Sequence, residues 1–168
     1  MAIRIDALRS AAARGRATAA RTLNEAKALG LKTVFLCHSH RDASLVVGLE
    51  RLLADDGWRV YVDWQDAEMP ESPNRETAAR IQQKIVTLDY FLFLATQNSM
   101  ASRWCPWEIG YADGKKDLDQ IFIVPTTDGL TTHGSEYLQL YRRIDISQQG
   151  PLGAWQPGQS SGLLLRDL

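Results

Sequence analysis

Three polar segments hold most of the side chains that could carry chemistry, and each directly follows a short apolar run. They are His38–Asp42, Asp63–Pro70 and Thr96–Glu108. The first contributes two histidines, the second carboxylates and a tryptophan, and the third two tryptophans, a cysteine and a glutamate. A carboxylate stabilises a developing positive charge, and a tryptophan offers a flat surface on which a ring can stack. We therefore expect a functional site where these segments meet.

The elements that position these segments are predicted to be alternating strands and helices. Four apolar runs are continuous, which is typical of strands covered on both faces. They are Val34–Cys37, Val60–Val62, Tyr90–Ala95 and Ile121–Val124, with a weaker fifth at Arg143–Ile146. Repeated β-α-β units predict a doubly wound α/β fold with a parallel sheet, in which ligands bind beyond the carboxyl ends of the strands. The three polar segments follow the first three strands, so they are expected to meet there.

Helix signals separate the strands. Asp42 is expected to cap a helix that Gly57 ends. Asn74 is expected to cap a second helix, and Pro106 suits the first turn of a third that runs to about Gly114.

Charge and composition divide the chain into three parts. Residues 1–30 carry six basic and two acidic residues, a net charge of +4, and are expected to form one appended helix that ends at Gly30. Residues 31–148 contain the strands of the expected domain. Residues 149–168 are rich in glycine, proline and serine and are expected to be a linker-like tail.

The overall composition is that of an ordinary folded domain. The 168 residues are 45% hydrophobic and 23% charged, with a net charge of -1 that gives no general reason to expect a nucleic acid as partner. The chain has neither an apolar run of membrane-spanning length nor an apolar leader, and its two cysteines exclude a disulfide scaffold. We therefore expect a cytoplasmic protein that does not enter a membrane.

Several familiar sites are excluded by the sequence. The chain lacks both Gly-rich phosphate-binding motifs and the G-x-S-x-G nucleophile elbow. A phosphoacceptor site of this topology needs acidic residues after the first strand, where the chain has His38, Ser39 and His40. Cys37 beside these histidines suggests a metal site, but strand alternation turns Cys37 away from them, so we expect no metal.

Three motifs resemble the Toll/interleukin-1 receptor (TIR) domain family. Val34–Asp42 resembles its first-strand motif, and Val60–Asp63 with the following polar loop resembles its second strand and BB loop. Ser102–Glu108 resembles its S-x-W-C-x-x-E segment. The resemblance covers roughly residues 32–146 and implies a five-stranded, flavodoxin-like sheet.

The resemblance also implies an activity. Many bacterial and plant TIR domains cleave NAD with a glutamate at the start of the third helix, four residues after a tryptophan. In this sequence, Glu108 occupies the position of the glutamate and Trp104 that of the tryptophan. The resemblance therefore implies that Glu108 is the catalytic residue and that Trp104 is a stacking surface. NAD is then a substrate, and no cofactor is expected. The other expected substrate-binding residues are His38, Ser39, Asp63 and Trp107.

Each of these residues also has an ordinary structural explanation. Glu108 stands two residues after Pro106, at the third helical position, where the helix dipole favours an acid in any case. A histidine at a strand end is often simply hydrogen-bonded, and Asp63 can pair with a base instead of a ribose. The BB loop contains Pro70 and Pro73 where the family usually has a glycine, which stiffens it.

The leading hypothesis is a NAD glycohydrolase or cyclase that releases nicotinamide and ADP-ribose or a cyclic ADP-ribose isomer. A nearly bare TIR domain of bacterial composition resembles the signal-producing component of Thoeris-like antiphage defence. That resemblance implies a homo-oligomer formed through TIR contacts and a separate effector that responds to the product. Two alternatives stay open: a non-catalytic TIR interaction module, and an N-glycosidase similar to nucleoside deoxyribosyltransferases.

Overall fold

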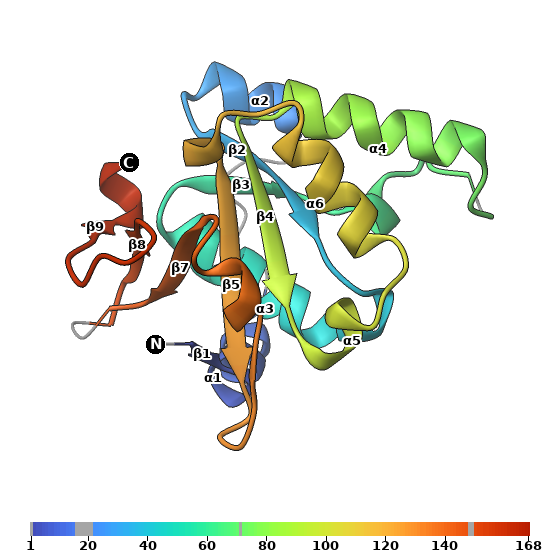
Figure 1. The fold of residues 1–168 in the computed structure, drawn as a ribbon. Helices are drawn as coiled ribbons and strands as arrows, with labels where there is room; N and C mark the ends of the chain where they lie inside the picture. The colour runs from blue at the N-terminus through green and yellow to red at the C-terminus, as the bar shows by residue number, and fades with distance from the viewer. Residues whose placement is uncertain (1, 16–21, 71, 148–149) are drawn as a thin grey trace.

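Helices cover both faces of one mainly parallel sheet in the computed structural model, which describes residues 2–15, 22–70, 72–147 and 150–168 (Figure 1). The strands are β1 (Ile3–Arg4), β2 (Lys32–Cys37), β3 (Trp58–Tyr61), β4 (Tyr90–Ala95), β5 (Ile121–Thr127), β6 (Thr132–His133), β7 (Arg142–Ile146), β8 (Leu152–Trp155) and β9 (Leu163–Leu164). The helices are α1 (Ile5–Ala13), α2 (Leu23–Ala28), α3 (Ala43–Asp55), α4 (Arg75–Thr87), α5 (Gln97–Met100) and α6 (Cys105–Asp113). Two 3-10 turns that matter for the site are η1 (His40–Asp42) and η2 (Asp63–Gln65). Within the described residues, none of these helices is both long and apolar enough to cross a membrane.

The sheet has the strand order β3-β2-β4-β5-β7-β8-β9. Neighbouring strands from β3 to β7 are parallel, and their order is that of a flavodoxin-like sheet, as the sequence predicts. The short strands β1 and β6 pair with the carboxyl end of β5, and β8 and β9 add antiparallel strands beyond β7. The sheet is therefore wider than the five strands that the family resemblance implies.

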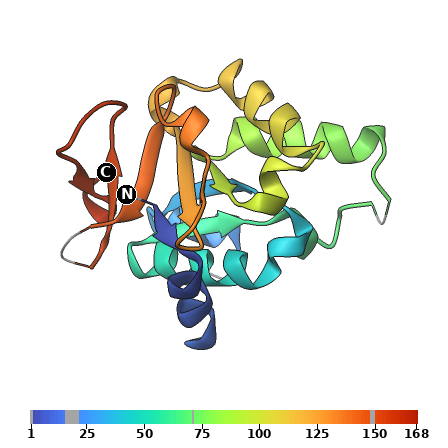
Figure 2. The same ribbon diagram turned by 60° about the horizontal axis from the view of Figure 1, so that its bottom comes forward.

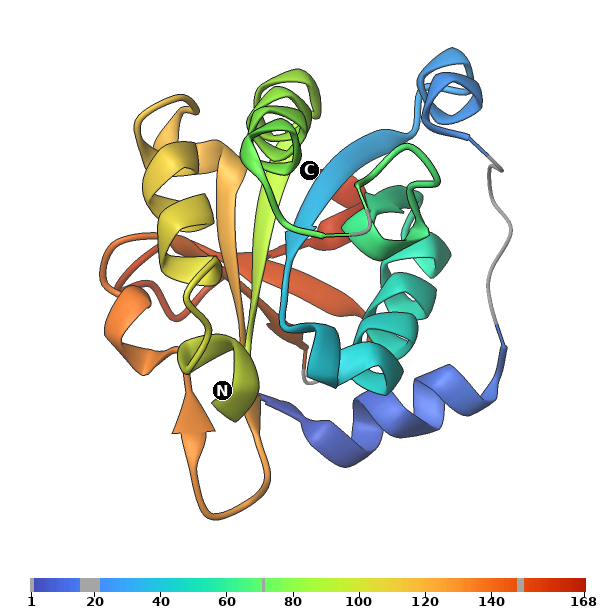
Figure 3. The ribbon, with the colours of Figure 1, turned by 90° about the vertical axis from the view of Figure 1, so that its right-hand side faces the viewer.

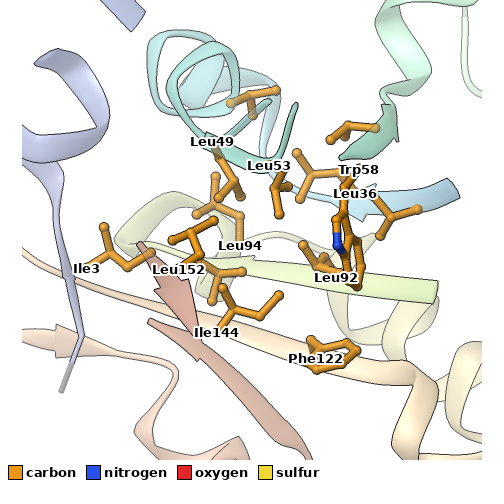
Figure 4. Close-up of a cluster of buried hydrophobic side chains, with 14 of the residues drawn as sticks. Ile3, Leu36, Leu49, Leu53, Trp58, Leu92, Leu94, Phe122, Ile144 and Leu152 are labelled. Carbon is orange, nitrogen blue, oxygen red and sulfur yellow. The ribbon is translucent and has the colours of Figure 1, made fainter. Parts of the chain in front are cut away.

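Alternate residues of the parallel strands point into opposite cores, which explains why the apolar runs are unbroken. On β2, Val34 and Leu36 belong to the core beneath α1 and α3, whereas Phe35 and Cys37 belong to the core beneath α4 and α6. Figure 4 shows part of the first core, where leucines of α3 lie over the sheet. Figures 2 and 3 show α1 lying against α3 on the outside of that face.

The caps of the helices agree with the sequence pattern except at Asp42. Asn74 caps α4 as predicted, because its side-chain oxygen accepts two backbone N–H groups of the first turn at 2.8 and 3.0 Å. Asp42 stands at the start of α3, but its carboxylate makes no cap bond there. It is buried and instead accepts hydrogen bonds from the Thr96 hydroxyl and the Asn98 amide. Asp42 therefore ties the loop after β2 to the loop after β4.

The N-terminal segment differs from the single appended helix that was expected to end at Gly30. β1 joins the sheet, α1 packs on α3, and α2 is a separate helix, while residues 16–21 lie outside the described part of the chain. Ile3 and Leu8 are fully buried. The approach of α1 to α3 is so close that a Cβ atom on Gly48 would lie 2.0 Å from the Leu8 carbonyl oxygen. The first helix therefore contributes to the core.

The tail also differs from the linker that its composition predicts. β8 pairs with β7, β9 pairs with β8, and Leu165 is fully buried. The glycines that suggested flexibility make room for a ring: a Cβ atom on Gly153 or Gly162 would lie 2.6 or 2.7 Å from the Trp155 side chain. The expected boundary between residues 148 and 149 falls outside the described residues.

We predict that Leu165→Ala lowers the free energy of unfolding by about 2–5 kcal/mol, the usual cost of truncating a buried leucine. Leu165 also fixes the tail through its carbonyl, which accepts the Trp58 indole N–H at 3.3 Å. The matched control is Leu163→Ala, because Leu163 is 58% exposed and its truncation should cost under about 1 kcal/mol. Urea unfolding measures both values. Equal and small costs would show that the tail does not contribute to the core.

Candidate active site

The Glu108 carboxyl group is buried in the first turn of α6, the helix labelled beside β4 in Figure 1. The Glu108 N–H donates to the Trp104 carbonyl at 2.9 Å, and Trp104 is the residue that precedes the helix. Glu108 is therefore the fourth helical residue, one position later than Pro106 suggested. Although Glu108 is only 6% exposed, it lines an open pocket. The pKa of a carboxyl group at that depth depends on the groups around it.

Burial raises the pKa of Glu108 from its ordinary 4.5 to about 8. The nearby Cys105 also raises this pKa, a hydrogen bond with the Cys37 thiol lowers it, and the Asp63 charge raises it further. At neutral pH the protonated form of this carboxyl group is therefore favoured. A cationic ligand beside it would favour the ionised form and lower the pKa. Strongly perturbed carboxyl groups in clefts are typical of functional sites.

Two free and buried cysteines form the wall behind Glu108. Cys105 Sγ lies 3.4 Å from the His38 carbonyl oxygen, and Cys37 Sγ lies 3.9 Å from the Cys105 carbonyl oxygen. Cys37 belongs to the core beneath α6, so the alternation of β2 turns it away from the histidines, as predicted. Burial raises the pKa of the Cys37 thiol well above its ordinary value. A hydrogen bond with Cys37, by contrast, lowers the pKa of the Cys105 thiol.

The pocket beside Glu108 has a volume of about 290 Å³ and opens between the loops after β2 and β3, α4 and the start of α6. Five of the six residues expected from the sequence line it: Glu108, Trp104, His38, Ser39 and Asp63. The wall from α4 was not expected, because its inward residues looked like ordinary core positions. That wall consists of Thr77 and Ile81, with Pro73 just before the helix. The other lining residues are His40 and Arg41 after β2 and Ser102 before α6.

A family model described as "TIR domain" matches residues 34–156, which is more than half of the chain. The chain belongs to the TIR domain family. The match includes both strand motifs and the S-x-W-C-x-x-E segment, so it confirms the resemblance that these motifs carry. It also extends through β8, the first strand of the tail.

One curated relative is similar over about two thirds of the chain. It is named "Probable 3' cyclic ADP-D-ribose synthase ThsB'" and comes from Bacillus cereus (strain MSX-D12). The two sequences are 35% identical over 111 residues, which is 64% of this chain and 58% of the relative. The chain therefore spans little more than half the length of that protein.

The BB loop of this TIR domain is held by contacts within the chain. The Tyr61 hydroxyl donates to the Asp66 carboxylate at 2.7 Å, and Glu68 lies 3.0 Å from Arg80. Pro73, at the end of the loop, lines the pocket. Asp66 and Glu68 therefore each have a partner within the chain.

Trp107 is the expected site residue that does not line the pocket. Successive helical residues point about 100° apart, so Trp107 leaves α6 on a different side from Glu108. Trp104 and Trp107 are each 36% exposed, and their rings meet edge to face with centroids 5.4 Å apart. Together with Ala78 and Arg103 they line a shallow depression next to the pocket. Only Trp104 belongs to both hollows of the TIR domain surface.

Asp63 pairs with two histidines from the neighbouring loop of the TIR domain. Its carboxylate oxygens lie 3.5 Å from His38 Nε2 and 3.1 Å from His40 Nε2. The contact with His40 is the pairing with a base that the sequence left open as the alternative to a ribose contact. His40 was not an expected site residue, although its position two residues after His38 was a signal for it.

We predict that Glu108→Gln stabilises the protein increasingly as pH rises. The folded state holds the Glu108 proton up to about pH 8, whereas the unfolded chain loses it near the ordinary value of 4.5. The wild type therefore loses stability between these two pH values, and the neutral glutamine does not. The difference at about pH 8 should be on the order of a few kcal/mol, or roughly 5–15 °C in Tm.

Thermal melts of the wild type and Glu108→Gln between about pH 5 and pH 8 measure this difference. The matched control is Glu136→Gln, because Glu136 is exposed and its substitution should leave the pH dependence unchanged. A Tm difference between wild type and Glu108→Gln that is constant over this range would contradict the raised pKa.

Proposed function

We propose that this TIR domain cleaves the bond between nicotinamide and ribose in NAD, releasing nicotinamide and ADP-ribose or a cyclic ADP-ribose isomer. The observation that carries the proposal is the buried Glu108 carboxyl group, with its raised pKa, on the wall of a pocket that Trp104 also lines. The name of the relative, a probable 3' cyclic ADP-D-ribose synthase, supports the same chemistry and favours a cyclic product.

One carboxylate suffices for this reaction because the leaving group already carries a positive charge. When the C1'–N bond breaks, its electron pair goes to the nicotinamide ring nitrogen, and no acid has to protonate the leaving group. The ribose carbon becomes an oxocarbenium-like centre, which the Glu108 carboxylate stabilises. Attack by water then gives ADP-ribose, and attack by another group of the same ADP-ribose gives a cyclic isomer. In either case, the nucleophile loses one proton.

The cationic nicotinamide ring also brings Glu108 into its reactive form. In the free pocket, burial holds the pKa of Glu108 at about 8. A positive charge beside a carboxyl group lowers its pKa, so binding of NAD favours the carboxylate that the reaction needs. His38, Ser39 and Asp63 line the same pocket and supply polar groups for the hydroxyls of the substrate.

We expect incubation of the protein with NAD to release nicotinamide, and Glu108→Gln to reduce the rate at least a hundredfold, because it removes the charge that stabilises the transition state. Chromatography of the products measures both rates and separates linear from cyclic ADP-ribose. Glu136→Gln serves again as the exposed control. Cleavage of 2'-deoxynucleosides in place of NAD would indicate the N-glycosidase alternative. Failure to cleave either substrate over a wide range of protein concentration would favour the interaction module.

We predict that Trp104→Ala lowers the ratio of cyclic to linear product more than it lowers total NAD consumption. Trp104 lines the pocket, and a stacked ring matters most when the dinucleotide must fold back on itself. Trp104→Phe should keep most of the cyclic product, and Trp107→Ala is the control because Trp107 lies outside the pocket. An unchanged product ratio in Trp104→Ala would exclude the stacking role.

The biological setting is part of the same proposal. We place the protein in the cytoplasm as a homo-oligomer formed through TIR contacts, with its product acting as a signal to a separate effector in Thoeris-like antiviral defence. The free state of both cysteines and the name of the relative support this setting. Sedimentation over a hundredfold range of concentration, combined with specific activity at each concentration, tests whether assembly and turnover are linked.

A further inference from the structure

His38, His40 and Asp63 form a compact group of potential metal ligands on one side of the pocket. One ligand atom from each residue can be chosen so that all three lie within 4.8 Å of one another. The group joins two loops, since the histidines follow β2 and the aspartate follows β3. Asp42, the nearest further carboxylate along the chain, is engaged by Thr96 and Asn98 and does not belong to it.

The hydrogen bonding of His38 leaves a lone pair facing this group. His38 Nδ1 lies 2.7 Å from the Leu36 carbonyl oxygen, which can only accept, so Nδ1 carries the proton. In the neutral ring, Nε2 then has a lone pair, and this atom is buried without a hydrogen-bond partner. It lies 3.5 Å from an oxygen of Asp63, which is also an acceptor. Two acceptors this close repel each other unless one of them gains a proton or a cation binds both.

We propose that His38, His40 and Asp63 bind a divalent transition-metal ion of the Zn²⁺ class. Two imidazoles and one carboxylate are a common ligand set for such ions, and an open fourth position is usual. Ligand atoms about 2.0–2.1 Å from a tetrahedral ion lie roughly 3.3 Å apart. His38 Nε2 lies 3.5 Å from Asp63 Oδ1, and His40 Nε2 lies 3.1 Å from Asp63 Oδ2, both close to that value. All three ligand atoms lie within 4.8 Å of one another, so the group must tighten slightly around an ion.

The surroundings of the three ligands are suited to a metal. The bond from His38 Nδ1–H to a backbone carbonyl is the second contact that fixes most metal-binding imidazoles. The Trp64 backbone N–H donates to Asp63 Oδ1 at 2.8 Å and orients the carboxylate. The Trp64 ring meets the His38 ring edge to face at 4.3 Å and the His40 ring at 5.7 Å, which shields one side from water.

The ligand atoms need only a small rearrangement to close on an ion. The His38 side chain is 2% exposed, whereas the His40 side chain is 70% exposed and already lies 3.1 Å from the Asp63 carboxylate. All three residues line the pocket that Glu108 also lines, so an ion bound by them would share that pocket with Glu108. From the sequence, Cys37 was the candidate third ligand beside the two histidines, and no metal was expected because Cys37 points away from them. The structure instead places Asp63, which follows β3, beside the histidines.

Equilibrium dialysis of the full chain against ZnCl2, followed by metal analysis, tests the site. We expect about one ion per chain and a rise in Tm with zinc concentration, because a ligand that binds the folded state stabilises it. His40→Gln should weaken zinc binding at least tenfold. His133→Gln is the matched control, since His133 is the one remaining histidine of the sequence and should leave binding unchanged.

Co²⁺ in place of Zn²⁺ identifies the ligands. We expect visible absorption bands of a low-coordinate Co²⁺ site in the wild type and His133→Gln, and their loss in His40→Gln. A sulfur-to-metal charge-transfer band would show that Cys37 or Cys105 binds the ion, and it would overturn the proposal. Equal zinc affinity in His40→Gln, or binding that does not saturate, would also overturn it. None of these measurements involves NAD, so their outcome is independent of the proposed reaction.

Discussion

The burial of the Glu108 carboxyl group is the constraint on which the rest of the site depends. Because α1 and α3 cover one face of the sheet and α4 and α6 cover the other, polar chemistry is confined to the carboxyl ends of the strands. The first turn of α6 packs there against Cys37 of β2, and burial of the Glu108 carboxyl group raises its pKa to about 8. Ionising it costs stability, and the two packed cores offset that cost.

The raised pKa couples ionisation to the charge of the ligand. A neutral Glu108 attracts no cation at long range, but a positive ring placed beside it shifts the equilibrium towards the carboxylate. NAD carries that charge, whereas its reduced form does not. The same positive charge makes nicotinamide a good leaving group. In the proposed reaction, the pocket therefore favours NAD over its reduced form, because only NAD carries the positive charge that ionises Glu108 and makes nicotinamide leave.

Sequence patterns predicted the parallel sheet and much of the candidate site because both depend on local features. The unbroken run at Tyr90–Ala95 and the cap at Asn74 reflect rules that act within a few residues, and polar segments that follow neighbouring parallel strands must meet. Trp107 is an exception, because the direction of a helical side chain depends on where the helix starts. The helix begins at Cys105, one residue before Pro106, so Glu108 is the fourth helical residue and not the third.

Other features depend on packing between distant segments and could not be read locally. The contact of α1 with α3 requires Gly48 beneath Leu8, and nothing in the surrounding pattern marks that glycine as different from others. The glycines of the tail resemble those of a linker, yet Gly153 makes room for Trp155. The group of His38, His40 and Asp63 joins two loops, so its spacing along the chain does not follow a familiar metal-binding motif.

The most direct test of the central claim is the pKa of Glu108 itself, measured by 13C NMR of the side-chain carboxyl group with and without a non-hydrolysable NAD analogue. Glu108→Gln assigns the signal. A value of about 8 in the free protein, which falls when an analogue with a cationic ring binds and stays high with its uncharged counterpart, is the expected result. A value near the ordinary 4.5, or one that does not respond to the charge of the ring, would contradict the role given to this buried carboxylate.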